Sequence, residues 1–387
     1  MNLIYISPHF PPNFTNFSIE LAKNGVNVLG IADTPYEQLD DLLKASLTDY
    51  YRVENLDDYN QVYRACACFI HKHGRIDRVE SHNEYWMMHE AGLREDFNII
   101  GPGVAQTEKI KRKSEMKKIF KAAGAPVVEG EIVKDQKSLQ KFIKKHGYPV
   151  FTKPDVGVGG TRTFTIFNEE DVNTFWKYKP DVNYFVEPFI DGILMTFDGI
   201  ADQNGEIAFT SSLRSTNSAS SVIENGEDLS FYIVREIPED AEAVGRKVLK
   251  GFDIRAKFFH LEFLRRKSDN KLFTLEMNCR APGGYTLDLI NFANDISVYR
   301  EWANIIAFNE FKAKFERKYY AAHIARREGK NYLHTNDDIF RKYKEKIASY
   351  TAVPAIFADV MGNEAFLVRS RVETDIKEMI EFIQAVK

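Results

Sequence analysis

The sequence contains little cysteine and no marked excess of either charge. Three cysteines among 387 residues cannot form a full disulfide framework, so we expect the protein in a reducing cytoplasm. The formal net charge is only −4 with both signs mixed, which gives no electrostatic basis for a nucleic acid partner. No apolar run is long enough to span a membrane, and the first residues lack the pattern of a secretory signal. The composition therefore disfavours nucleic acid and membrane as main partners.

Two familiar kinds of ligand site are also not expected. The first expected strand leads into residues 7–13 (SPHFPPN) rather than a glycine-rich turn, so we predict no nicotinamide site there. Cys66 and Cys68 form a C-x-C pair within an expected helix, where residues two apart do not share a face. This spacing disfavours a metal site at the two cysteines.

The N-terminal part shows alternating strands and helices. The expected elements are a strand at 2–6, a helix at 16–25, a strand at 26–31, a helix at 57–74 and a strand at 77–80. Such alternation predicts an α/β fold with a parallel sheet and helices on both of its faces. In sheets of this kind, ligands lie beyond the carboxyl ends of the strands.

The rest of the chain mixes helices with strands. We expect a long helix from its N-cap Thr107 to Gly124, followed by strands that flank a glycine-rich turn. Residues 215–230 show no periodicity, which fits either a mobile lid or an ordinary loop. From about residue 310 the order strand, helix, two strands, helix indicates a small closing subdomain.

An amphipathic hairpin carries the most informative polar residues. If its turn is centred on Asp269, Glu262 faces Glu276 and His260 faces Asn278 across the two strands. Alternation then predicts an apolar core face made of Phe259, Leu261, Phe263, Phe273, Leu275 and Met277. Like charges directly opposite each other are destabilising, so the two glutamates need a compensating partner. Hard oxygen ligands suit Mg²⁺, which commonly shares the phosphates of a nucleotide. The alternative is a solvent-facing polar stripe.

A glycine-rich turn and two lysines give weaker signals. Lys153 ends an expected strand, and Gly157, Gly159 and Gly160 follow, so that backbone N–H groups can face phosphate oxygens. The pattern is neither of the common phosphate-binding motifs, and a strand follows rather than a helix. Lys113 lies on a basic helix face, which by itself fits a solvated surface.

Taken in order, these pieces resemble the ATP-grasp superfamily over roughly residues 100–310. The matching pieces are Lys113 before AGAP, YPVFTKPDVGVGG, FVEPFIDG, the glutamate of HLEFL and the Glu-x-Asn-x-Arg of LEMNCR. The resemblance implies a Rossmann-like domain followed by an ATP-grasp fold of two α+β subdomains. The implied boundaries are 1–105 for the Rossmann-like domain, 106–190 for the lid subdomain, 191–310 for the large metal-binding subdomain and 311–387 for a C-terminal α+β subdomain.

The resemblance also implies that ATP and one or two Mg²⁺ (or Mn²⁺) ions bind to named residues. The implied ATP contacts are Lys113, Lys153, Gly157, Gly159, Gly160 and Thr161 at the phosphates, and Glu187, Pro188, Phe189 and Ile190 as the hinge at the adenine. The implied metal ligands are Glu262, Glu276 and Asn278, with Arg280 stabilising the transferring phosphoryl group. One departure is Leu194, where many members have a ribose-binding glutamate; Asp191 and Asp198 are the alternatives.

The activity implied is an ADP-forming ligase that converts a small carboxylate to an acyl phosphate and joins it to an amine. No protein nucleophile is needed, and we expect Cys279 on the apolar face. The candidate substrate contacts are Glu84, Arg214, Gly283 and Gly284, although residues 81–84 also fit an ordinary helix N-cap. Two alternatives stay open, namely a bicarbonate-using carboxylase or carbamoyl-phosphate-synthetase-like enzyme, and a non-catalytic nucleotide-binding regulator. The sequence also leaves open whether the protein is a homodimer.

Overall fold

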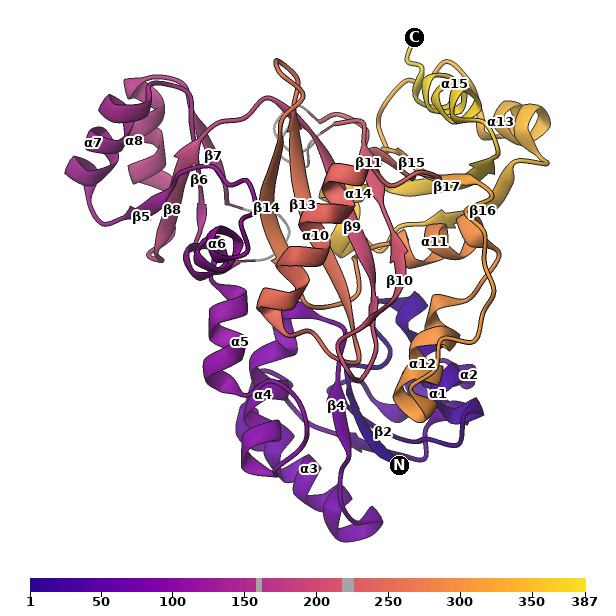
Figure 1. Cartoon of the computed structure of the whole chain (residues 1–387). Helices are drawn as coiled ribbons and strands as arrows, with labels where there is room; N and C mark the ends of the chain where they lie inside the picture. The colour runs from indigo at the N-terminus through magenta and orange to yellow at the C-terminus, as the bar shows by residue number, and fades with distance from the viewer. Residues whose placement is uncertain (158–161, 218–225) are drawn as a thin grey trace.

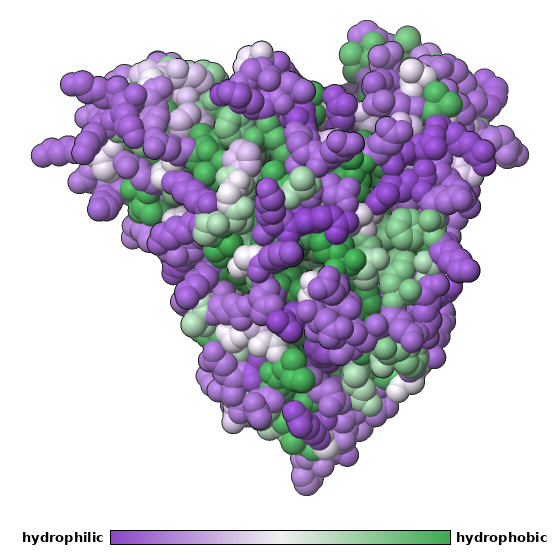
Figure 2. All heavy atoms as spheres, in the orientation of Figure 1, coloured by the Kyte–Doolittle hydropathy of each residue, from purple (hydrophilic) through white to green (hydrophobic). Residues whose placement is uncertain are grey.

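Three β-sheets organise the computed structural model, which describes residues 1–157, 162–217 and 226–387 (Figure 1). The N-terminal sheet lies at the bottom of the view, a small sheet lies at the upper left, and a large sheet fills the centre and right. Hydrophilic residues dominate both upper corners of this face, and apolar residues show mainly between and below them (Figure 2). Within the described residues, no helix is long and apolar enough to cross a membrane.

The N-terminal sheet is parallel, as predicted, with strand order β3-β2-β1-β4. Its strands are β1 (Asn2–Ile6), β2 (Asn27–Ala32), β3 (Asp49–Arg52) and β4 (Arg78–Glu80), and its helices are α1 (Thr15–Lys23), α2 (Asp41–Ser46), α3 (Tyr59–His73) and α4 (Met87–Asp96). The edge strand β3 was not predicted, because its sequence DYYR is short, polar and only partly buried. The carboxyl end of β4 lies against the large sheet, because its last residue, Glu80, contacts Lys257 of that sheet at 2.8 Å.

The small sheet is antiparallel with strand order β5-β8-β6-β7. Its strands are β5 (Glu131–Val133), β6 (Val150–Pro154), β7 (Phe164–Ile166) and β8 (Tyr184–Pro188), and its helices are α7 (Gln136–His146) and α8 (Glu169–Tyr178). One face packs on these helices through residues such as Val150 and Val186. Since side chains alternate along a strand, Lys153 and Glu187 lie on the opposite face.

Nine of the described strands form the large sheet, in the order β14-β13-β9-β11-β12-β15-β17-β16 with β10 paired to β9. These strands are β9 (Gly192–Ala201), β10 (Ile207–Ser211), β11 (Leu213–Ser215), β12 (Ser230–Ile233), β13 (Lys257–Arg266), β14 (Leu272–Asn278), β15 (Tyr320–Arg326), β16 (Ile347–Ala352) and β17 (Glu364–Ser370). The accompanying helices are α10 (Glu239–Phe252), α11 (Thr286–Asn294), α12 (Val298–Phe308), α13 (Asn336–Tyr343), α14 (Ala358–Met361) and α15 (Glu373–Gln384). The C-terminal order of elements is as predicted, but β15 pairs with β12 and so continues the large sheet.

The expected long helix is two helices, α5 (Val104–Lys111) and α6 (Lys113–Ala122). Arg112 between them is extended, with φ −91° and ψ 119°. Asp155, which follows β6, explains the break, because its carbonyl accepts from the Lys113 N–H at 2.9 Å and its carboxylate from the Ser114 N–H at 2.8 Å. The first of these helices begins at Val104 with Gly103 as its N-cap, so Thr107 is buried inside α5 and is not an N-cap.

The predicted hairpin register is confirmed at the two glutamates. Glu262 pairs with Glu276, and His260 pairs with Asn278. The register then shifts, so that Phe263 faces Thr274 rather than Leu275. The predicted core face is consequently wrong for Phe273 and Leu275, which are half-buried, while Leu272 and Thr274 are buried in their place.

Candidate functional site

The facing glutamates form the centre of the site. The side chains of Glu262 and Glu276 are 23% and 16% exposed, and the Lys113 Nζ lies 3.0 Å from a Glu276 oxygen. Burial raises the pKa of Glu276, and the charge of Glu262 adds to this while Lys113 opposes it. Burial also acts to raise the pKa of Glu262, but His260, Arg280 and Lys113 outweigh it and lower that pKa. The neighbouring cations therefore compensate the negative charges of the two glutamates only in part.

His260 supplies the nearest compensating charge within the sheet. Its Nδ1 lies 2.6 Å from Asp198, and its Nε2 lies 3.2 Å from Glu262. Burial disfavours the charged ring, but the two carboxylates outweigh this and raise the pKa of His260 to about 9. Asp198 is fully buried and also accepts from the Thr196 hydroxyl at 2.5 Å. Asp198 is therefore unavailable to a ribose, whereas Asp191 is exposed and lies 2.7 Å from Lys267.

The side chains around the glutamate pair fit a magnesium ion that shares nucleotide phosphates. Among residues 1–157, 162–217 and 226–387, no group of three or more His, Cys, Asp or Glu side chains is arranged to hold a metal. Two carboxylates and the buried amide of Asn278 are fewer protein ligands than a closed site needs. Mg²⁺ commonly keeps waters and takes phosphate oxygens beside one or two carboxylates, so this incomplete set suits it.

The two predicted phosphate-binding lysines are buried rather than solvated. Lys113 begins α6, and besides contacting Glu276 it donates to the carbonyl of Gly157 at 3.0 Å. Lys153 lies on β6, 2.7 Å from Glu187. Each ammonium is thus held by a carboxylate next to the start of the glycine-rich turn. The predicted contacts Gly159, Gly160 and Thr161 lie outside the described residues.

Glu187, the predicted hinge glutamate, is bound by two lysines. Glu187 is buried in β8, 2.7 Å from Lys153 and 2.8 Å from Lys117. Burial alone would raise its pKa, but the two ammonium groups outweigh this and lower the pKa of Glu187 to about 2. The sequence analysis did not predict a role for Lys117. Lys117 lies four residues after Lys113 in the same helix, and this spacing indicates that the two lysines share a helix face.

Part of the backbone after Glu187 already forms hydrogen bonds within the chain. The Phe189 N–H donates to the carbonyl of Pro149 at 3.0 Å, and Pro188 has no N–H. Ile190 is half-buried and supplies the next N–H group of the predicted hinge, and within the described residues this group has no backbone–backbone hydrogen bond. The Phe189 ring is 38% exposed beside this position.

On the opposite side, Glu84 and Arg280 come together. Glu84 is buried in the segment that joins β4 to α4. The Arg280 guanidinium donates to the carboxylate of Glu84 at 3.4 Å. The Arg280 guanidinium also donates to the carbonyl of Ala281 at 2.9 Å. The N-cap interpretation also holds, since the Asn83 side chain accepts from the Tyr85 N–H. Residues 196 positions apart in the chain thus converge at one place.

Gly283 and Gly284 form the turn between Arg280 and α11. Gly284 has φ +60°, and its carbonyl accepts from Asn13 at 3.0 Å, so the N-terminal domain fixes this turn. A Cβ added at Gly283 would have no neighbour within 4 Å. The backbone of Gly283 is therefore open to a ligand.

Arg214 does not join the site. It pairs with Met195 on β9, whereas the neighbouring Thr196 pairs with Glu262, so alternation places Arg214 on the opposite face of the sheet. Its charge acts instead on Tyr232 and on Glu373 of α15. The prediction of Arg214 as a substrate contact is wrong for this reason.

Cys279 is buried in the apolar cluster beneath the hairpin, as predicted. Burial raises the pKa of its thiol to about 12. A thiol in this environment stays protonated and is a poor nucleophile.

The sequence reasoning also missed a buried ion network that joins the N-terminal sheet to β13. The Lys257 Nζ lies 2.8 Å from Glu80 and 3.5 Å from Glu90, and Arg94 lies 2.8 Å from Glu90. Glu80 also accepts from the N–H groups of Ser81 and His82. The network thus ties the residues before Glu84 to the strand that carries Glu262.

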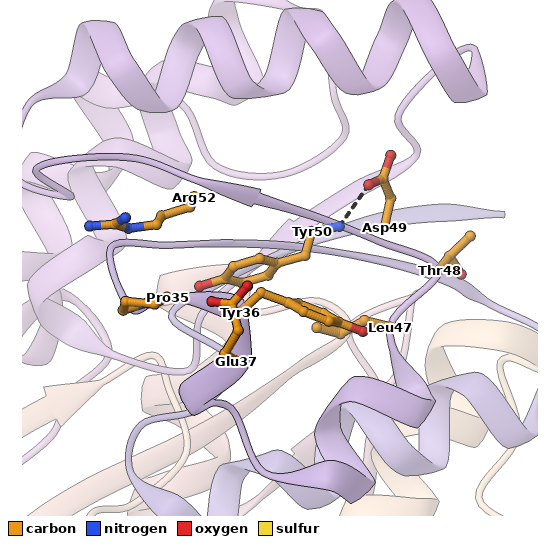
Figure 3. A pocket seen from close by; sticks show the side chains of 8 residues that line it. All are labelled: Pro35, Tyr36, Glu37, Leu47, Thr48, Asp49, Tyr50 and Arg52. Atoms are coloured by element: carbon orange, nitrogen blue, oxygen red, sulfur yellow. Dashed lines mark hydrogen bonds between the residues drawn. The ribbon is translucent and has the colours of Figure 1, made fainter.

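Two open surface hollows lie away from these residues. One, of about 510 Å³, lies along β3 and is lined by residues that include Tyr36, Tyr50 and Arg52 (Figure 3). The other, of about 540 Å³, lies beside α13 and includes Arg326 and Arg327. Neither hollow is lined by Lys113, Lys153, Glu187, Glu262, Glu276, Arg280 or Glu84.

Comparisons with known proteins bear on the fold of the chain. Residues 112–190 match the family model for the ATP binding domain of the carbamoyl-phosphate synthase L chain. The L-amino acid ligase from Bacillus licheniformis superimposes with a TM-score of 0.76 at 14% identity, covering 98% of this chain and 96% of that chain. The chain has the ATP-grasp fold. No curated protein matches the sequence.

Other proteins with the ATP-grasp fold superimpose over nearly the whole chain. The Staphylococcus aureus N5-carboxyaminoimidazole synthetase complexed with ADP has a TM-score of 0.70 at 18% identity, covering 98% of this chain and 97% of that chain. The biotin carboxylase domain dimer of the Hydrogenobacter thermophilus 2-oxoglutarate carboxylase, with MgADP, ADP and bicarbonate, has 0.70 at 16% identity, covering 100% and 90%. At these identities the likeness concerns the fold.

Proposed function

We propose that the protein is an ATP-dependent ligase that activates a small carboxylate as an acyl phosphate and joins it to an amine. ADP and phosphate are the other products. The observation that carries the proposal is that Lys113 contacts Glu276 directly opposite Glu262, inside an ATP-grasp fold. Phosphoryl transfer needs aligned charges more than a protein nucleophile, and these residues supply such charges.

In this proposal the adenine of ATP lies at Glu187 to Ile190, and the phosphates lie between Lys153 and Lys113. Glu262, Glu276 and Asn278 hold Mg²⁺ (or Mn²⁺), which neutralises charge on the transferring phosphoryl group when it is bound. Lys113 then exchanges its carboxylate partner for a phosphate oxygen. Gly157 and the three residues Gly159, Gly160 and Thr161 contribute backbone or hydroxyl donors to the same phosphates.

Arg280 and Glu84 act on the carboxylate and the amine. The Arg280 side chain is 15% exposed and is oriented by Ala281, so its charge is placed where water is scarce. It stabilises the transferring phosphoryl group and the acyl phosphate. The N–H groups of Gly283 and Gly284, at the start of α11, bind the acid, and Glu84 attracts the amine.

The domain layout stays part of the proposal. Residues 106–190 act as the lid, 191–310 carry the metal site, and 1–105 and 311–387 enclose the substrates. A cytoplasmic location and a homodimer complete the proposal, the latter supported by the dimer of one structural neighbour.

The test is ADP release measured across a panel of carboxylic acids and amines. We expect release only when a particular acid is present, and its loss in Glu276→Gln with the fold retained. Glu242→Gln is the control, because Glu242 pairs with Arg246 on the exposed face of α10. An unchanged rate in Glu276→Gln removes the metal assignment. Tight ATP binding without release from any acid would instead support the non-catalytic regulator.

A bicarbonate-using enzyme is the second candidate. It is favoured by the carbamoyl-phosphate synthase match at residues 112–190 and by the bicarbonate in one structural neighbour. The same assay separates the two functions, because a bicarbonate enzyme releases ADP with bicarbonate alone or with biotin, and shows no selectivity among organic acids.

A further inference from the structure

Two lysines on one face of α6 reach two different carboxylates. Lys113 and Lys117 are four residues apart, so they share a helix face. Lys113 contacts Glu276 on β14, and Lys117 contacts Glu187 on β8. Both lysines are buried, whereas the adjacent Lys118 is exposed. The face of α6 that looks into the nucleotide site therefore carries one cation more than the resemblance assigned.

Lys117, Glu187 and Lys153 form a closed buried triad. Their side chains are only 5–6% exposed, and both ammonium groups lie within 2.8 Å of the one carboxylate. Two cations and one anion leave an excess of one positive charge in the interior. Such a charge is costly unless it has a further acceptor. Lys117 also donates to the carbonyl of Val128 at 3.4 Å, whereas Lys153 lies on the strand that leads toward Gly157.

We infer that Lys117 is a positioning residue for the nucleotide, which holds Glu187 in place so that Lys153 is free to donate to a phosphate oxygen. The inference rests on the proposed function. Without Lys117, the departure of Lys153 would leave a buried carboxylate without its cation, which is strongly unfavourable. With Lys117 present, Glu187 keeps one partner, and the exchange of Lys153 costs far less.

The inference predicts a specific effect on the phosphate-dependent part of binding. Adenosine has no phosphates, so its affinity does not require Lys153 to leave Glu187. ADP does require this exchange. In Lys117→Met, Glu187 keeps Lys153 as its remaining lysine partner, so the charge-assisted hydrogen bond from Lys153 to a phosphate of ADP is lost. The ratio of the adenosine dissociation constant to the ADP dissociation constant should therefore fall about tenfold or more. A merely structural role would weaken both ligands equally and leave the ratio unchanged.

The experiment is calorimetric titration of the full chain with adenosine and with ADP in the presence of Mg²⁺. Lys118→Met is the matched control, since Lys118 pairs only with the neighbouring Glu115 on the exposed face of α6. The double variant Lys117→Met/Glu187→Gln should recover most of the ratio, because no carboxylate charge then retains Lys153. Lys117→Arg should also keep the ratio near that of the wild type.

Two results would overturn the inference: an unchanged ratio in a folded Lys117→Met protein, or no recovery in the double variant. Thermal unfolding establishes that each variant folds, and Lys117→Gln takes the place of Lys117→Met if the latter does not. The failure of the proposed function would appear differently, as a wild-type protein that binds neither ADP nor adenosine, or that binds ADP but releases none from ATP with any acid.

Discussion

Lys257→Met tests whether the buried ion network stabilises the protein and fixes β13 against the N-terminal sheet. The side chains of Lys257 and Glu80 are 8% and 6% exposed and lie 2.8 Å apart. Arg94 still pairs with Glu90 in the variant, so the cost falls mainly on Glu80. Removal of one partner from a buried ion pair typically costs about 3–5 kcal/mol. We therefore expect the free energy of unfolding, measured by urea denaturation, to fall by about that amount.

The pH dependence of this loss gives the prediction its sharpest check. Burial acts to raise the pKa of Glu80, but Lys257 and Arg94 outweigh it and hold that pKa below its usual value. In the wild type, the stabilising contribution of Glu80 is thus present above the unfolded pKa of about 4.3 and is lost as the pH falls through the folded pKa. In Lys257→Met, burial without the cation raises the folded pKa, so protonation relieves the penalty.

The difference between wild type and variant should consequently be largest near pH 7–8 and shrink as the pH falls toward about 4.3. Lys267→Met is the control, because Lys267 forms an exposed pair with Asp191 that is worth at most about 1 kcal/mol. A loss in Lys257→Met as small as that of the control would refute the reasoning. A large loss that did not decrease in acid would refute the assignment to Glu80.

The remaining predictions concern the site. Lys153→Met should lower the affinity for ADP about tenfold or more while the adenosine affinity changes less, as calorimetry would show, and an equal loss for both ligands would contradict a phosphate contact. Arg214→Ala should leave the KM for the acid unchanged, because Arg214 lies on the far face of the sheet from Glu262; a raised KM would contradict that placement. Gly284→Ala should destabilise the protein by more than about 1 kcal/mol and raise the KM for the acid, because φ is +60° there and the added Cβ would collide with the Met361 side chain; an unaffected KM would place the acid elsewhere.

The sequence predicted the parts of the site that depend on local rules. Alternation and a turn centred on Asp269 were enough to place Glu262 opposite Glu276. They were not enough for the residues nearer the turn, because the register shift after Glu262 depends on backbone geometry and not on residue type. The apolar character of Phe273 and Leu275 therefore suggested burial that the bulge prevents.

The features that the sequence did not predict arise where residues distant in the chain meet. Lys257 and Glu80 are separated by 177 positions, and neither sits in a pattern that marks it as buried. The break between α5 and α6 depends on Asp155, which belongs to the small sheet and takes the first N–H groups of α6. Residues 107–123 contain no glycine or proline, so the local sequence does not predict a break at Arg112.

The break at Arg112 also explains why one helix can serve both sheets. Because Asp155 caps α6, the first residue of that helix is fixed beside the end of β6 in the small sheet. Met116 and Phe120 of the same helix pack into the core that covers the large sheet. Lys113 and Lys117 therefore reach Glu276 in one sheet and Glu187 in the other from a single rigid element. A phosphate that draws Lys113 away from Glu276 therefore acts on the same helix that holds Glu187 of the small sheet through Lys117.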